Sequence, residues 1–168
     1  EWLPQESIVF DGALADTGLR IGMAENATYL GWEILCLGRT GSGERFSAGQ
    51  CRLQTEIRSD GKRLWFERGN IRPGSRVDHA PAGLGGHSVC ATLVAAGSGL
   101  DDSLLQRCRE KSARDGATGI TRPVGSLLIA RYLGDSSEAA RHYFESLRSE
   151  LRPALTGLQA ITPRIWLT

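Results

Sequence analysis

The sequence predicts a mainly β protein with two helices, and three observations lead to this class. Residues 51–58 alternate between apolar and polar side chains, with the period of two that a half-buried strand requires. The 21 glycines fall mainly between apolar runs, as in a protein with many tight turns. Residues 102–113 and 136–151 instead repeat their apolar side chains with helical spacing.

A hairpin near the middle of the chain is the clearest predicted element. Asp60-Gly61 follows the first alternating run and favours a tight turn, because both positions tolerate positive φ. Residues 63–71 then return as the second strand. On that strand Trp65 shares a face with Glu67 and not with its apolar neighbours, so it either enters a second buried layer or contacts another protein.

The remaining strands are expected on both sides of this hairpin. Apolar runs predict them at residues 6–10, 18–23, 27–37, 87–96 and 124–133. Residues 114–121 are mostly polar and carry two glycines, so we expect a loop there. No stretch is long enough to separate two domains, and residues 1–168 are therefore treated as one domain.

The two helices have different end signals. The first is expected from about Asp102 to Ala113. The second is expected over residues 136–151, with Asp135 as N-cap and Glu138 reaching back to it. Pro153 is expected to end it, since the residue before a proline is disfavoured in the helical region. The apolar stripe of this helix consists of Ala140, Phe144, Leu147 and Leu151.

Composition argues against several classes of partner. The net charge of +1 gives no reason to expect nucleic acid. No apolar run approaches the roughly 20 residues that span a bilayer, so a membrane is not expected either. The four cysteines, Cys36, Cys51, Cys90 and Cys108, are widely spaced and form no Cys-x-x-Cys pair. We therefore expect reduced thiols in a cytoplasmic protein, without a structural zinc site.

The glycine-rich segment after residues 31–37 is not a nucleotide-binding loop. Gly38 and Gly43 have the separation of a P-loop, but Glu44 and Arg45 follow where Lys and Ser or Thr are required. A carboxylate at that place would repel a phosphate. Nor does the sequence contain a Gly-x-Ser-x-Gly nucleophile motif, and we expect no enzymatic activity.

Several motifs in order carry a resemblance to a known family. They are Glu-Trp-Leu-Pro-Gln-Glu at 1–6, Ile-Val-Phe-Asp-Gly-Ala at 8–13, the block 31–46, Leu-Trp-Phe-Glu-Arg-Gly at 64–69, Pro-Ala-Gly-Leu-Gly-Gly-His at 81–87, and Pro-Arg-Ile-Trp near the end. Together they resemble the urease accessory protein family UreD, also called UreH. The resemblance implies a stacked, superhelical β fold, of which this chain would be the larger C-terminal part, truncated at its N-terminal side.

The resemblance also implies a function. Members of the family are urease maturation factors that bind apo-urease and UreF, and reach the GTPase UreG through UreF. They are thought to guide nickel through an internal tunnel to the urease active site. We therefore expect nickel in transit and no tightly bound cofactor.

Acidic residues within the matched motifs are the candidates for such a conduit. Glu33 is the most conspicuous, because a charge within an apolar strand must be matched. It either pairs with an arginine such as Arg39 or Arg45, or faces a wet interior channel. The further candidates are Glu6, Asp11, Glu44 and Glu67.

Two other sets of residues were singled out. His79, His87 and Cys90 could together form a weak metal site, which would make the protein a self-standing metal carrier. Arg164 and Trp166 near the end of the chain, with Trp65, are candidates for contact with a partner, since Trp and Arg are enriched in interface hot spots.

Overall fold

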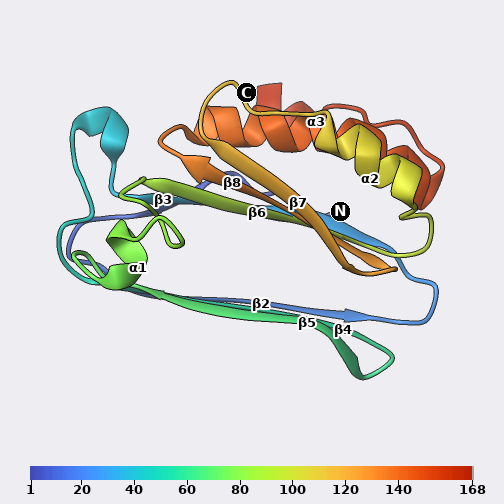
Figure 1. Cartoon of the computed structure of the whole chain (residues 1–168), viewed down its shortest axis with the longest axis horizontal. Helices are drawn as coiled ribbons and strands as arrows, with labels where there is room; N and C mark the ends of the chain where they lie inside the picture. Colours follow the sequence, from blue (N-terminus) through green and yellow to red (C-terminus); the bar gives the residue numbers. More distant parts are fainter. Residues whose placement is uncertain (168) are drawn as a thin grey trace.

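Three layers make up the fold in the computed structural model, which describes residues 1–167 (Figure 1). The middle layer is a five-stranded sheet of order β1-β3-β6-β8-β7. Helices α2 and α3 cover one of its faces, and a three-stranded sheet of order β2-β4-β5 lies below the other. The short helix α1 lies at one end, between the levels of the two sheets.

The strands are β1 (Ser7–Val9), β2 (Leu14–Met23), β3 (Tyr29–Leu37), β4 (Gln50–Ser59), β5 (Lys62–Ile71), β6 (Val89–Ala96), β7 (Ala117–Val124) and β8 (Leu127–Gly134). The helices are α1 (Arg76–His79), α2 (Asp102–Arg109) and α3 (Ser137–Thr156), with 3-10 turns η1 (Thr40–Ser42) and η2 (Arg164–Leu167). The mainly β class is thus confirmed; the superhelical stacking stays an expectation. None of the described helices is long and apolar enough to cross a membrane.

The main core lies between α3 and the five-stranded sheet. Phe144, Leu147 and Leu151 of α3 are fully buried there against the sheet. The Trp32 ring packs against Phe144, with ring centroids 6.0 Å apart. The predicted apolar stripe of this helix therefore faces the sheet, as its spacing required.

Strand β3 contributes side chains to both faces of the five-stranded sheet. Its residues Leu30, Trp32 and Ile34 belong to the helix-side core, while Leu35 and Leu37 belong to a cluster between the sheets. The Glu33 side chain therefore lies on the inter-sheet face, because successive side chains of a strand point to opposite faces.

The predicted hairpin is present as β4 and β5. The two strands pair antiparallel, and Asp60 and Gly61 both have positive φ, at 46° and 73°. Trp65 packs inside, against the inter-sheet cluster that contains Ile57 and Val94. Trp65 is partly buried there, which of the two alternatives favours a place in a second layer.

The prediction of a loop at residues 114–121 is wrong for most of that range. Residues 117–124 form β7, which pairs antiparallel with β8 at the edge of the five-stranded sheet. An edge strand leaves one side to water, so its mostly polar composition is compatible with pairing. Ile120 is partly buried and packs against the helix-side core.

The ends of the helices also differ from the prediction. Ser136, not Asp135, caps α3 by accepting from the backbone N–H of Ala139. The helix passes Pro153 and ends at Thr156, because buried Leu155 extends the apolar stripe and Gly157 supplies a left-handed cap. Helix α2 ends at Arg109, four residues before the expected end, and α1 was not predicted.

Candidate functional site: a hollow between two sheets

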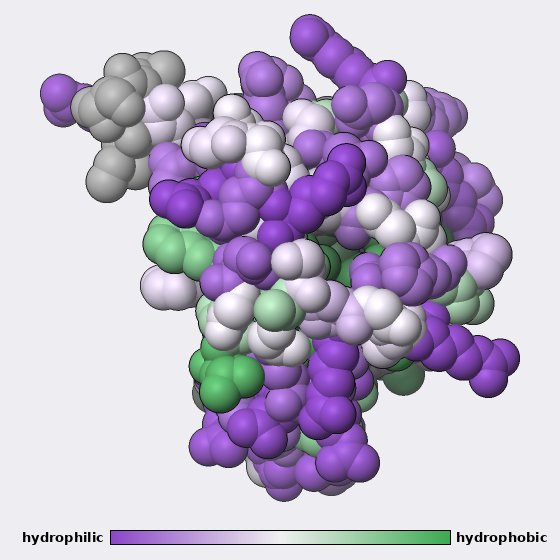
Figure 2. Space-filling model, turned by 90° about the vertical axis from the view of Figure 1, so that its left-hand side faces the viewer, coloured by the Kyte–Doolittle hydropathy of each residue, from purple (hydrophilic) through white to green (hydrophobic). Residues whose placement is uncertain are grey.

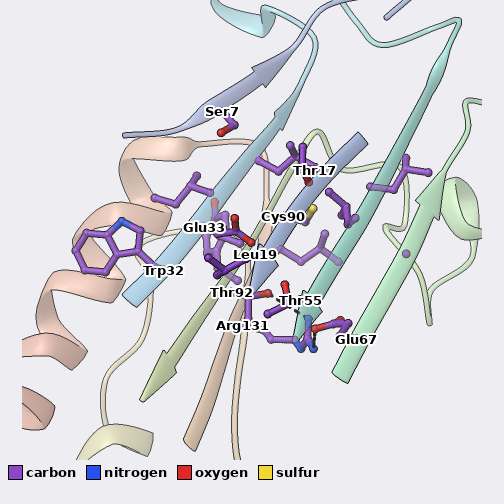
Figure 3. A pocket seen from close by; sticks show the side chains of 18 of the residues that line it. Ser7, Thr17, Leu19, Trp32, Glu33, Thr55, Glu67, Cys90, Thr92 and Arg131 are labelled. Carbon is purple, nitrogen blue, oxygen red and sulfur yellow. Dashed lines mark hydrogen bonds and ion pairs between the residues drawn. The ribbon is translucent and has the colours of Figure 1, made fainter. Parts of the chain in front are cut away.

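A hollow of about 490 Å³ lies between the two sheets (Figure 3). Residues of both sheets line it, and Val77 and Leu84 of the segment around α1 border it as well. Two apolar clusters also lie between the sheets, one containing Leu37 and Ile71 and the other containing Ile57. The sheets therefore touch through apolar side chains but enclose a space that is not filled by them.

Strand register brings the polar side chains of the hollow into rows. On the five-stranded sheet, Glu33 of β3 is paired with Thr92 of β6, which is paired with Arg131 of β8. On the three-stranded sheet, Thr55 of β4 is paired with Glu67 of β5. Figure 3 shows these side chains directed into the space between the sheets.

An ion pair crosses the hollow. Nη2 of Arg131 lies 2.8 Å from Oε2 of Glu67, and Nη1 donates to the hydroxyl of Thr92 at 3.2 Å. The Arg131 side chain is 46 % exposed and that of Glu67 is 37 % exposed, so water reaches both partners. Such a pair is worth little stability, about 1 kcal/mol or less.

Glu33 borders the hollow with no hydrogen-bond or ion-pair partner among residues 1–167. Its predicted partner Arg39 is instead bound to Glu44, with Nε 3.0 Å from Oε2. The surrounding walls remove part of the hydration of the carboxylate and so raise its pKa. Burial, with a smaller contribution from Glu33, also raises the pKa of Tyr29 to about 12. Glu33 is itself exposed, so of its two alternatives the geometry favours a carboxylate on a water-accessible space between the sheets over a buried ion pair.

Cys90 also borders the hollow, but its thiol is otherwise enclosed by protein. Burial raises its pKa to about 12, and burial likewise raises the pKa of Cys36, Cys51 and Cys108. All four cysteines are free. A thiol must lose its proton to bind a metal ion, so neutral Cys90 is a poor ligand.

The other acidic candidates have structural partners away from the hollow. Glu6 pairs with Arg141 of α3. Asp11 accepts from the backbone N–H groups of Ala48 and Ser47, which lower its pKa. The hydrogen bond from Arg39 lowers the pKa of Glu44 in the same way. Of the five acidic residues predicted from the sequence, Glu33 and Glu67 are therefore the two that line the hollow.

The two histidines of the alternative metal site have separate carboxylate neighbours. Nε2 of His79 lies 3.4 Å from Asp78, and Nδ1 of His87 lies 2.9 Å from Oδ2 of Asp135. Asp135 also accepts from the backbone N–H of Ser88, which is the main cause of its lowered pKa. Within the described part of the chain, no three His, Cys, Asp or Glu side chains are grouped to hold a metal ion.

The predicted partner-binding residues near the end of the chain lie in different surroundings. Arg164 is exposed at the start of η2. Trp166 is partly buried on the helix-side core, with its ring centroid 5.4 Å from that of Trp32 and the Arg148 guanidinium 6.0 Å away. Trp166 therefore has a packing role, whereas the Arg164 side chain is available for contact.

Several polar residues of the hollow do not follow from the sequence, among them Thr55, Thr92 and Arg131. Arg131 carries the same signal as Glu33, a charge within an apolar strand, and could have been singled out on that ground. Thr92 carries no such signal, because threonine is common in strands. Its place in the row follows from the pairing of β6 with both β3 and β8.

Comparison with known proteins agrees with the motifs. The family model described as UreD urease accessory protein matches residues 1–167. The chain belongs to the UreD family.

Individual relatives give the same result over the whole chain. The chain is 45 % identical to the urease accessory protein UreD of Azoarcus sp. (strain BH72) and 46 % identical to that of Pseudomonas paraeruginosa (strain DSM 24068 / PA7), each over 168 residues. Both alignments cover 100 % of this chain and 59 % of the relative. The chain thus spans about three fifths of the length of these curated relatives.

Proposed function

We propose that this UreD-family chain belongs to a urease maturation factor that guides nickel ions toward the urease active site, in the cytoplasm. The complete protein would bind apo-urease and UreF, and reach UreG through UreF. The observation that carries the proposal is the unpaired carboxylate of Glu33 on a hollow enclosed by two sheets. In a protein of this family, such a space is suited to hold a cation without retaining it.

The chemistry of the lining supports weak binding. Carboxylate, hydroxyl and water oxygens are ligands that a hydrated divalent ion exchanges readily. Glu33 and Glu67 lie on opposite sheets, with the hydroxyls of Thr55 and Thr92 in the same rows. A path that used deprotonated thiols and several imidazoles would hold nickel much more tightly.

The surface offers places for partners on the outside of this space. Figure 2 views the end that carries α1 and η1, where the surface is mostly hydrophilic with separate hydrophobic patches. Exposed Arg164 remains our candidate for contact with UreF, together with its neighbour Trp166, which is partly buried against Trp32. Trp65 is partly buried between the sheets and stays the third candidate for contact with a partner.

The experiment compares two Glu→Gln variants of the complete protein. Glu33→Gln removes the unpaired charge of the hollow, and Glu25→Gln makes the same change in the exposed turn between β2 and β3. Both variants are purified with UreF and apo-urease, and urease activation is measured over a series of nickel concentrations. We expect both to assemble normally and Glu33→Gln alone to need several-fold more nickel for half-maximal activation. Equal activation by the two variants would contradict a role of the hollow in delivery.

A further inference from the structure

The ion pair between Arg131 and Glu67 occupies a special place among the ion pairs of residues 1–167. The other pairs lie within one sheet, within loops, or between helices and their surroundings, whereas this one joins the five-stranded to the three-stranded sheet. It does so across the hollow rather than through packed protein (Figure 3). Its contribution to holding the sheets together is small, because both side chains are wet.

The same pair sets the charge of the hollow. The charged residues among its described lining are Glu33, Glu67 and Arg131, which together carry a net charge of −1 when all are ionised. With Arg131 on Glu67, an entering cation meets one free carboxylate, that of Glu33. If Arg131 left Glu67, the cation would meet two carboxylates, one on each sheet.

Arg131 has the freedom to leave. Its other hydrogen bond inside the hollow is to the Thr92 hydroxyl at 3.2 Å, a long bond with a neutral acceptor that does not fix the guanidinium as a second carboxylate would. Glu33 lies two strands away in the same register row, at about 10 Å between backbones. Long arginine and glutamate side chains can bridge that separation, so Glu33 is a second carboxylate within reach of the guanidinium.

We propose that Arg131 is an internal competitor for the carboxylates of the hollow, which keeps divalent cations from being retained there. A divalent ion would displace the guanidinium from Glu67 on arrival, and the guanidinium would displace the ion in turn. Arg131 thereby determines how weakly the hollow binds its cargo. The inference rests on the proposed function only in taking that cargo to be a divalent cation.

The test measures cation binding directly, with Mn²⁺ alone as the probe. Mn²⁺ prefers oxygen ligands, so the exposed histidines contribute little background, and its free concentration is read from its electron paramagnetic resonance signal. In the complete protein, Arg131→Gln should bind Mn²⁺ at least tenfold more tightly than the wild type. Arg131→Lys keeps the charge and should stay within about twofold of the wild type, since a lysine still competes. Wild-type affinity in a folded Arg131→Gln variant would overturn the inference.

A second pair of variants measures the same effect when Glu67 has already been neutralised. Glu67→Gln leaves Glu33 and Arg131, whereas Glu67→Gln with Arg131→Gln leaves Glu33 alone. The double variant should bind Mn²⁺ several-fold more tightly than the single variant, and equal affinities would again overturn the inference. This comparison tests the inference even if the single variant Arg131→Gln does not fold.

The outcome is separable from that of the proposed function. Mn²⁺ binding by the purified protein reports on Arg131 whether or not urease is present. Tighter binding by Arg131→Gln upholds the competitor even if Glu33→Gln activates urease normally, in which case the delivery role alone fails. Unchanged Mn²⁺ binding overturns the competitor even if Glu33→Gln impairs activation.

Discussion

The two faces of the five-stranded sheet differ in almost every physical respect. The face under α2 and α3 is dry and continuous, with Leu93, Phe144 and Leu147 at zero exposure. The face toward the three-stranded sheet carries Glu33 and Arg131 and leaves a hollow. The inter-sheet face is closely packed at its two apolar clusters and carries charge only at the hollow between them, whereas the helix side is packed throughout.

The difference predicts where substitutions are costly, and the largest effect is expected on the helix side. Phe144→Ala removes a fully buried ring that packs against Trp32 and Tyr143. It should lower the free energy of unfolding by about 3–5 kcal/mol, through lost burial and the cavity left behind. Urea unfolding of the complete protein, followed by circular dichroism, measures the change.

The contrasting change is Thr55→Val on β4, which borders the hollow from the three-stranded sheet and keeps the shape of the side chain. We expect a change within about 1 kcal/mol in the same measurement. A comparable loss in both variants would show that the hollow is as closely packed as the helix-side core.

How far the sequence predicts this arrangement depends on the range of the interactions involved. The hairpin at Asp60-Gly61 and the stripe of α3 depend on neighbouring residues, and both were predicted. The edge strand β7 and the passage of α3 through Pro153 were missed, because partners distant in the sequence decide them. Local propensity is overridden by such packing.

The candidate site shows the same limit more sharply. Glu33 was singled out because a charge in an apolar run is unusual, but its neighbours in the row come from strands about 60 and 100 residues further along. Only the pairing of β6 between β3 and β8 places Thr92 and Arg131 beside it. The sequence thus predicted the charge, and the topology supplied the hollow that explains it.

An intermediate effect is expected when equivalent ion pairs are broken on the two sides of the molecule. On the helix side, Arg148 has a side-chain exposure of 6 %, lies 2.7 Å from Glu1 and donates to the carbonyl of Ile161. Arg148→Met should cost about 2–3 kcal/mol, since it leaves the Ile161 carbonyl without this donor and Glu1 with Arg152 as its remaining arginine partner. Glu67→Gln, which breaks the wet pair with Arg131, should cost less than about 1 kcal/mol.

Thermal and urea unfolding of the two variants side by side tests this contrast. Similar losses of unfolding free energy in Arg148→Met and Glu67→Gln would mean that the pair between Arg131 and Glu67 stabilises the contact between the two sheets. Arg131 would then be too firmly held to act as a competitor for a cation.

The smallest expected effect has the opposite sign and depends on pH. Loss of hydration raises the pKa of Glu33 above its ordinary value near 4.5. Between that value and the pKa in the folded protein, the folded state binds more protons than the unfolded state, so the contribution of Glu33 to stability falls as pH rises. Above the folded pKa, the ionised carboxylate destabilises the folded state.

Glu33→Gln should therefore raise the free energy of unfolding at pH 7, by less than about 1 kcal/mol because water reaches the side chain. At pH 3, well below the ordinary pKa of 4.5, the glutamate is protonated in both states, and the variant and the wild type should be equally stable. Urea unfolding at the two pH values, with Glu25→Gln as the exposed control, measures the difference. A loss of 3–5 kcal/mol at pH 7 would instead indicate that Glu33 neutralises a buried cation, and would remove it from any path taken by nickel.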